Sequence, residues 1–185
     1  MARIYIVMSG ESLSGFDFNL LKPYRVMAVN YSCHSVPFAQ DLIALDKKFY
    51  DDSEEFLSNY KGNCHTVENY SFGEHLIKYS VKQWPTHKVT GFDEYPFVCH
   101  GFNSGYTAIQ IAAHLGFDDI RLLGFDCGGG YHYTTEKPSG LGYSHLIKKV
   151  KILSKELPKS VSITNYSIDS KCISFRKKAL KTWEL

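Results

Sequence analysis

The stretch "HGFNSGYTAIQIAAHLGFDDIRLLGFDCGGGYHY", residues 100–133, contains a polar loop, an apolar helix, a strand and a glycine run in that order. Apolar residues between 106 and 115 recur at helical spacing, and Gly116 follows them as a C-cap. The next run, "DIRLLGFD", predicts a strand that ends at Asp126. A polar loop before a helix, with an acidic residue after the next strand, is how α/β proteins build ligand crevices.

Four other segments predict strands that alternate with helices. "ARIYIVM" at 2–8, "YRVMAVNY" at 24–31 and "LIALD" at 42–46 are apolar runs bounded by turns, and "SVSITNYS" at 160–167 is the last such run. Strands and helices that alternate along the chain favour a three-layer α/β sandwich. We therefore predict a mainly parallel, Rossmann-like sheet in a single domain, residues 1–185.

The helices that we expect around this sheet differ in their signals. Short helices should follow the first and third strands. The segment 144–157 alternates apolar and basic residues at helical spacing, so its lysines form the exposed face of an amphipathic helix, with Ser144 as a possible N-cap. A short closing helix is expected over 169–183.

Composition limits the class of protein. Hydrophobic residues at 44% and charged residues at 22% are typical of a globular domain, and a net charge of +2 gives no compositional support for nucleic-acid binding. No segment is apolar for long enough to span a bilayer, which predicts a cytoplasmic protein. The five cysteines include no C-x-x-C pair, so we expect packed, reduced thiols and not a disulfide or zinc framework.

Small and polar residues gather in loops where a parallel sheet would bind a ligand. The loops at 8–12, 30–35, 102–105 and 124–133 all have this character. Backbone N–H groups near a helix start can hold a phosphate, so Ser9, Gly10 and Ser12 in the first loop and Asn103, Ser104 and Gly105 in the third are candidate phosphate ligands. The Ser-Gly segment of the first loop could also be only a turn. Asn103 to Gly105 could equally cap the helix, and Asp126 could accept hydrogen bonds from a ribose or order a loop.

Histidines are the candidate proton carriers. His132 lies between Tyr131 and Tyr133 in the glycine-rich loop, and His145 precedes the helix at 144–157, so both could reach the crevice. There is no H-x-H or H-E-x-x-H spacing for zinc and no Walker lysine or G-x-G-x-x-G motif. No G-x-S-x-G elbow of an acyl hydrolase is present either.

The block "NSGYTAIQIAAHLGFDDIRLLGFD" at 103–126 resembles the corresponding motif of bacterial sialyltransferases and of the related DUF115 and archaeal 6-hydroxymethylpterin diphosphokinase (MptE-like) proteins. It also looks like small phage-encoded proteins labelled "norphogenetic". "MSGESL" at 8–13 is similar to the family's first loop, with Met8 and Glu11 in place of a glycine and a proline. "VMAVN" at 26–30 and "ITNYSIDS" at 163–170 resemble its second and last strands.

The resemblance implies a nucleotide pocket formed by the first loop, Asn30 and the loop at 103–105. In the sialyltransferases, tyrosines after the strand that ends in Gly-Asp stabilise the departing phosphate and a later histidine acts as base, without an obligatory metal. By order in the chain, Tyr131 and Tyr133 would take the first role and His145 the second.

We therefore expect a nucleotide-dependent transferase, glycosyltransferase-like, that uses a nucleotide-sugar donor, with His132 or His145 as base. One alternative is a pterin-type diphosphokinase, which would need Mg²⁺, for instance on Asp126 or Asp46. The other is a non-catalytic phage protein that binds or sequesters a nucleotide in the host cytoplasm. A homo-oligomer is compatible with each of the three.

Overall fold

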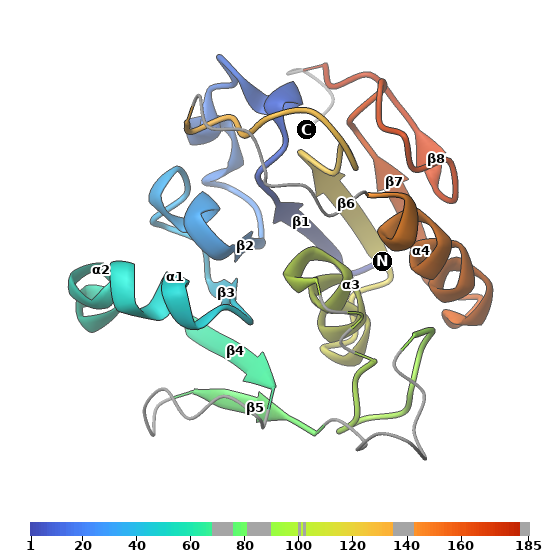
Figure 1. Ribbon diagram of the computed structural model, residues 1–185, viewed down its shortest axis with the longest axis horizontal. Helices are drawn as coiled ribbons and strands as arrows, with labels where there is room; N and C mark the ends of the chain where they lie inside the picture. The colour runs from blue at the N-terminus through green and yellow to red at the C-terminus, as the bar shows by residue number, and fades with distance from the viewer. Residues whose placement is uncertain (68–75, 81–89, 100, 102, 135–142, 182–185) are drawn as a thin grey trace.

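One parallel sheet organises the part of the chain that the structure describes. The structure is a computed structural model that describes residues 1–67, 76–80, 90–99, 101, 103–134 and 143–181 (Figure 1). Its eight strands lie in the order β5-β4-β3-β2-β1-β6-β7-β8, and every strand pair is parallel. The strands are β1 (Arg3–Val7), β2 (Val26–Val29), β3 (Asp41–Ile43), β4 (Asn63–Val67), β5 (Ile77–Tyr79), β6 (Asp119–Leu123), β7 (Ser162–Asn165) and β8 (Arg176–Lys177). The predicted α/β class and parallel sheet are confirmed.

The strand order reverses beside β1. The chain builds outward from β1 to β5, returns to the other side of β1 as β6, and continues outward to β8. Val7 at the end of β1 is therefore in register with Ala28 of β2 on one side and Leu123 of β6 on the other. Loops that leave β1 and β6 diverge to opposite halves of the sheet, which opens a crevice at their carboxyl ends.

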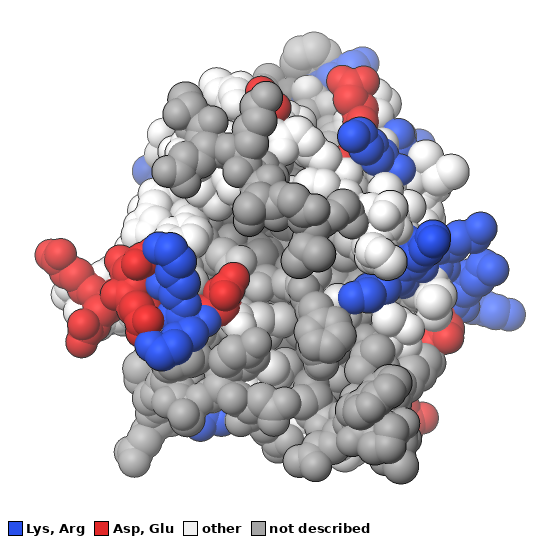
Figure 2. Space-filling view, viewed as in Figure 1, with Lys and Arg blue, Asp and Glu red and all other residues white. Residues whose placement is uncertain are grey.

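Helices of two kinds surround the sheet (Figure 1). The α-helices are α1 (Lys47–Asp52), α2 (Glu54–Asn59), α3 (Ser104–His114) and α4 (Ser144–Glu156), and the 3-10 helices are η1 (Glu11–Leu13), η2 (Phe18–Leu21) and η3 (Asn30–His34). Basic side chains gather over α4, and acidic and basic side chains lie together over α1 and α2 (Figure 2). Val150 and Leu153 of α4 are buried, and Lys148, Lys151 and Lys155 are exposed as predicted. Lys149 is half-buried, and its amine donates to the backbone oxygen of Gly101 at 2.7 Å.

The core divides into two layers because side chains alternate along each strand. Ile4 and Ile6 of β1 belong to the cluster that includes α3 and α4, whereas Tyr5 and Val7 belong to the cluster beneath η1, η2 and α1. Both faces of the sheet are thus covered, which explains why the strand sequences are apolar on both sides. Helix α3 packs as a buried helix, and Gly116, with φ at +86°, ends it as expected.

The short helices expected after the first and third strands are present, and those after β1 are the 3-10 helices η1 and η2. Asp17 starts η2, since its side chain accepts a hydrogen bond from the backbone N–H of Asn19. Two other local expectations need correction. The N-cap of α4 is Tyr143, and Ser144 is its first residue.

The closing helix expected over 169–183 is wrong for residues 169–181, which contain β8, and residues 182–183 lie outside the described ranges. The Ser170 hydroxyl donates to the backbone oxygen of Phe125, at 2.6 Å, and the Lys177 amine donates to the oxygen of Ser170, at 2.7 Å. These contacts outweigh the helical preference of the segment.

The cysteines and the helix lengths agree with the remaining expectations. The five cysteines are free and buried, as predicted. Within the described ranges, each helix is too short or too polar to cross a bilayer.

Candidate functional site

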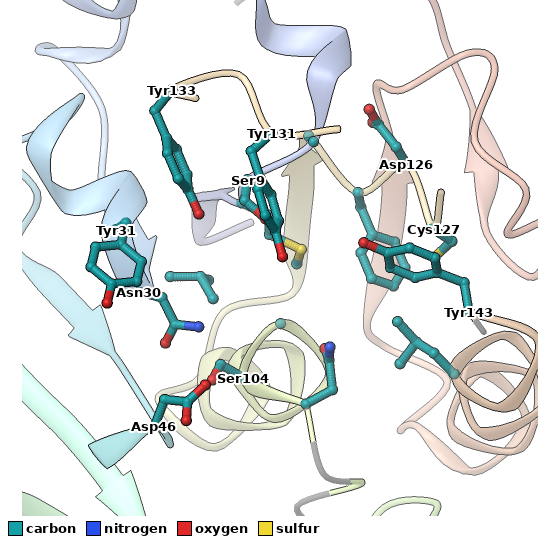
Figure 3. Close-up of a pocket in the computed structure, with 18 of the residues that line it drawn as sticks. Ser9, Asn30, Tyr31, Asp46, Ser104, Asp126, Cys127, Tyr131, Tyr133 and Tyr143 are labelled. Atoms are coloured by element: carbon teal, nitrogen blue, oxygen red, sulfur yellow. The ribbon is translucent and has the colours of Figure 1, made fainter. Parts of the chain in front are cut away.

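A cavity of about 880 Å³ opens at the carboxyl ends of β1, β2, β3 and β6 (Figure 3). It lies at the point where the strand order reverses, the position at which open parallel sheets bind ligands. Nine of the twelve predicted site residues line it: Ser9, Gly10, Asn30, Asn103, Ser104, Gly105, Asp126, Tyr131 and Tyr133. The other three, Ser12, His132 and His145, do not. The sequence thus located the cavity without defining all of its wall.

The N-terminus of α3 forms one wall of the cavity. Asn103 is the N-cap, and its side-chain oxygen accepts a hydrogen bond from the backbone N–H of Tyr106 at 2.9 Å. The Ser104 hydroxyl accepts from the backbone N–H of Leu45 at 3.3 Å, which ties the helix start to the end of β3. A Cβ at Gly105 would lie 2.9 Å from the sulfur of Met8, so glycine lets α3 approach the first loop closely. Asn103, Ser104 and Gly105 line the cavity, and the positive end of a helix favours an anion.

Asp126 joins the first loop to the loop after β6. Its carboxylate accepts hydrogen bonds from the backbone N–H of Ser12 at 2.8 Å and from the Ser12 hydroxyl at 2.6 Å. The Ser12 hydroxyl also lies 3.0 Å from that of Ser167. Of the two roles open to Asp126, ordering a loop is the one its contacts serve, and Ser12 supports the wall without lining the cavity.

The glycine-rich loop folds back over the first loop. The backbone N–H of Gly130 donates to the Glu11 carboxylate at 3.1 Å, and the backbone N–H of His132 donates to the oxygen of Ser9 at 2.9 Å. Gly10 and Tyr131 form an isolated antiparallel bridge. Glu11, which stands where the resembled motif has a proline, thus holds the glycine-rich loop by a hydrogen bond.

Tyrosines form the rim of the cavity (Figure 3). The rings of Tyr131 and Tyr133 are stacked, with centroids 5.4 Å apart and planes 4° apart, and the Tyr31 ring centroid lies 6.1 Å from that of Tyr133. Burial raises the pKa of Tyr133 to about 12, and a hydrogen bond with Ser9 opposes the shift. Burial also raises the pKa of Tyr143 on the opposite wall. Tyr133 and Tyr143 are therefore protonated near neutral pH and can donate hydrogen bonds.

Neither predicted histidine lines the cavity. The ring of His132 turns toward the sheet face beneath η2, where Nε2 lies 3.1 Å from the Ser35 hydroxyl and the ring centroid lies 5.3 Å from that of Phe18. Burial lowers the pKa of His132, so the ring is neutral at pH 7. His145 is exposed in the first turn of α4. Alternation along the loop places Tyr131 and Tyr133 in the cavity wall and His132 behind it.

Two wall residues have a backbone conformation that is costly for residues other than glycine. Asn30 has φ at +51° and Cys127 has φ at +52°, and they are the only such non-glycine residues among those that the structure describes. The side-chain oxygen of Asn30 is also buried without a hydrogen-bond partner. Strain and an unpartnered polar atom at the same cavity are typical of ligand-binding positions.

The acidic residues of the wall differ in their contacts. Asp52 accepts from the Tyr31 hydroxyl at 2.6 Å and forms an ion pair with Lys48 at 2.5 Å. Asp46 follows β3 as the N-cap of α1, but its side chain does not cap the helix. Figure 3 shows the Asp46 carboxylate directed into the cavity beside Ser104. Among the described residues, Asp46 is thus the wall carboxylate without an ion-pair or hydrogen-bond partner.

Sequence reasoning missed Tyr31, Tyr143 and Cys127 as wall residues. Tyr31 follows a predicted strand end and Cys127 follows Asp126, so the rule that located the crevice could have included both. Tyr143 had no such signal because α4 brings it to the wall from a distant part of the chain. In the described residues, no three His, Cys, Asp or Glu side chains are grouped as a metal site would require.

Comparisons with known proteins return no match among protein-family models, curated proteins or solved structures. The likeness to sialyltransferases and pterin diphosphokinases therefore stays a prediction. The function of the cavity has to be inferred from its geometry.

Proposed function

We propose that this protein is a nucleotide-dependent transferase that binds a nucleotide sugar in the cavity and transfers the glycosyl group to an acceptor. The observation that carries the proposal is the convergence, on one cavity, of the α3 N-terminus, a tyrosine rim and the unpartnered amide oxygen of Asn30. A volume of about 880 Å³ falls in the range of small-molecule sites.

The phosphates of the donor would lie at the N-terminus of α3. Ser104 and Gly105 occupy the first turn, whose backbone N–H groups have no acceptor within the helix. Gly10 and Ser9 line the adjoining wall. This arrangement supplies partial positive charge without a lysine or arginine. Among the described residues that line the cavity, Lys48 is the one lysine, and it forms an ion pair with Asp52.

The tyrosines would assist the leaving group. As the glycosidic bond to phosphate breaks, negative charge grows on the phosphate oxygen, and hydroxyl donors fixed in the wall stabilise it. Tyr133 suits this role because its raised pKa keeps the proton on the hydroxyl. Tyr131 stacks on Tyr133 and is held by its bridge to Gly10, so the pair has a fixed orientation.

We assign the base to Asp46, in place of the two histidines. Asp46 is directed into the cavity, whereas His132 lies behind the wall and His145 lies outside it. A carboxylate without a competing ion pair can accept the proton of an acceptor hydroxyl as that hydroxyl attacks the sugar. The same carboxylate is the candidate Mg²⁺ ligand in the diphosphokinase alternative.

A non-catalytic nucleotide binder is the second candidate. Both predicted histidines lie outside the cavity wall, which favours the non-catalytic binder. Such a protein needs contacts to the phosphates and the nucleobase but no proton acceptor. A ligand recovered unchanged after incubation with acceptors would support the binder over the transferase.

The decisive experiment is a thermal-shift panel of nucleotides and nucleotide sugars, with and without Mg²⁺. A ligand at a hundredfold excess over its dissociation constant stabilises the folded state by about 2.7 kcal/mol through mass action. Hits are then incubated with acceptors and followed by ³¹P NMR. No response to any compound would refute the transferase and the binder together, and strict Mg²⁺ dependence would favour the diphosphokinase.

Matched variants then separate binding from turnover. Asp46→Asn should retain the thermal shift and reduce turnover by about 100-fold or more, the usual contribution of a general base. Asp51→Asn on the same helix, outside the cavity wall, is the control and should change neither. Equal turnover in Asp46→Asn and the control would remove Asp46 as the base.

A further inference from the structure

We propose that Cys127 and Cys172 form an oxidation-sensitive dithiol, whose disulfide joins the cavity wall to the C-terminal segment and fixes the glycine-rich loop. Both side chains are buried, at 4% and 0% exposure, in the same apolar cluster. Cys127 lines the cavity, and Cys172 lies in the segment between β7 and β8. The proposal concerns the thiols themselves and does not depend on the ligand proposed above.

The backbones on either side of the two cysteines are already joined. The backbone N–H of Lys171 donates to the oxygen of Asp126 at 2.9 Å, one residue before each cysteine. Ser170 strengthens the junction, since its hydroxyl donates to the oxygen of Phe125 at 2.6 Å and accepts from the N–H of Cys172 at 3.1 Å. A disulfide needs two backbones at such short range, so the fold supplies the proximity before any oxidation.

The two thiols also interact with each other. The interaction with Cys127 lowers the pKa of Cys172, and Ser174 and Lys177 act in the same direction. The interaction with Cys172, together with burial, raises the pKa of Cys127. Cys172 is therefore the more acidic thiol of the pair, which suits it to attack an oxidised sulfur on Cys127.

A second pair of cysteines, Cys33 and Cys64, lacks the lowered pKa found at Cys172. Cys33 and Cys64 lie in the other core cluster, and burial raises the pKa of both, to about 12 and about 11. Neither lines the cavity. They should stay inert as thiols, and together with Cys99 they serve as internal controls.

Hydrogen peroxide is the oxidant class that the cavity would admit, because it is a small neutral molecule and Cys127 is part of the wall. In the first step the Cys127 thiol takes one oxygen atom from the peroxide and becomes a sulfenic acid, and a water molecule is released. In the second step the Cys172 thiol attacks the sulfenic sulfur, the S–S bond forms, and a second water leaves. The two thiols together lose two electrons and two protons, which the peroxide takes up.

The disulfide would act on the glycine-rich loop. Cys127 begins the turn that leads through Gly130 to Tyr131, and its φ of +52° marks a backbone held by its surroundings. A covalent bond to Cys172 prevents the backbone at Cys127 from unfolding locally away from the C-terminal segment. Exchange of the backbone amides at 128–134 should therefore be slower in the oxidised protein.

The test is disulfide mapping on the folded wild-type protein. The protein is treated with hydrogen peroxide, quenched, unfolded, alkylated and digested for mass spectrometry. We expect one cross-linked peptide pair that contains Cys127 and Cys172, and alkyl groups on Cys33, Cys64 and Cys99. Dithiothreitol should restore alkylation of all five. Full alkylation after peroxide, or a cross-link to another cysteine, would overturn the proposal.

Two variants and one dynamic measurement complete the test. Cys172→Ser should abolish the cross-link, and the control Cys99→Ser should leave it intact. Because substitutions at buried cysteines can impair folding, hydrogen exchange on the wild-type protein supplies an independent readout. Amides at 128–134 should exchange several-fold more slowly after oxidation while those of α2 stay unchanged. Equal exchange rates in the two redox states would refute the fixed loop even if the disulfide forms.

Discussion

Polar side chains at the amino and carboxyl edges of the sheet differ in their hydrogen-bond partners. At the amino edge, the buried carboxylate of Asp41 pairs with Arg25 at 2.6 Å and with His65 at 2.9 Å, and it accepts from the Asn63 amide at 3.1 Å. At the carboxyl edge, the side-chain oxygen of Asn30 is buried without a partner and the Asp46 carboxylate faces the cavity. The Asp41 carboxylate therefore serves the fold, whereas the oxygens of Asn30 and Asp46 are left for a ligand.

The largest expected effect comes from breaking the network at the amino edge. Burial by itself would raise the pKa of Asp41, but hydrogen bonds from His65 and Asn63 and the charge of Arg25 bring it below its ordinary value. Asp41→Asn removes the charge and leaves Arg25 without its counter-ion, which should cost about 3 kcal/mol in the free energy of unfolding. Urea denaturation measures it.

Asp46→Asn at the opposite edge is the matched control and should change the free energy of unfolding by less than about 0.5 kcal/mol. Similar losses in Asp41→Asn and Asp46→Asn would show that the two edges do not differ in the way described. Asp46 would then serve the fold as Asp41 does.

The contrast between the edges also explains what the sequence could predict. Strand ends with small or polar residues identified the carboxyl edge, because parallel strands bring those ends together regardless of loop detail. The network around Asp41 had no such signal, since Arg25, Asp41 and His65 come from separate strands or their flanks and meet only through the register of β2, β3 and β4. The closing helix was mispredicted for the same reason: tertiary bonds of Ser170 and Lys177 decided that segment.

A second prediction concerns the close contact that holds the cavity wall together. A Cβ at Gly10 would overlap the backbone oxygen of Gly124 and the carboxylate of Asp126. Gly10→Ala must therefore push the first loop away from β6, at a cost of about 2 kcal/mol. The midpoint temperature of thermal unfolding should decrease, and so should the increase in that temperature when ligand is added.

Gly15→Ala is the control for the second prediction and separates steric overlap from backbone strain. Gly15 has φ at +77°, but a Cβ added there would have no neighbouring atom within 4 Å, so only its backbone conformation resists alanine. Its substitution should cost about 1 kcal/mol and leave the ligand shift intact. A reduced ligand shift in both variants would mean that the wall contact is not specific to Gly10.

Two asparagines sharpen the comparison because one is partnered and the other is not. Asn165 donates to the oxygen of Phe125 and accepts from the N–H of Ser167, both at 3.0 Å, so Asn165→Ala should cost about 1 to 2 kcal/mol. Asn30→Gly relieves the positive φ and removes an unpartnered atom, so stability should change by about 0.5 kcal/mol or less. Ligand affinity should fall in Asn30→Gly alone, which thermal shifts and denaturation together can show.

The site was harder to predict than the fold because residue order alone does not give side-chain direction. His132 lies between two tyrosines that line the cavity, and a sequence cannot show which residues of an irregular loop face inward. The Ser35 hydroxyl and the Phe18 ring, from other parts of the chain, receive the imidazole. The order of residues therefore predicts that the loop borders the cavity but not which of its side chains enter it.

The smallest effect is a pH dependence that tests the placement of His132. Burial lowers the pKa of both His132 and His114 below the ordinary value of 6.5. At pH values below about 6.5, the unfolded chain binds more protons at these two histidines than the folded chain does. Their contribution to the free energy of unfolding should therefore be constant above about pH 6.5. It should decline as the pH falls from there toward the lower pKa values of the folded state.

His132→Gln and His114→Gln should each flatten this decline, measured by urea denaturation between about pH 5 and 8. If His132 lies behind the wall, His132→Gln changes the pH dependence of stability without changing ligand affinity at pH 7. A loss of affinity comparable to that of Asn30→Gly would instead place the imidazole in contact with the ligand and make it a catalytic candidate again.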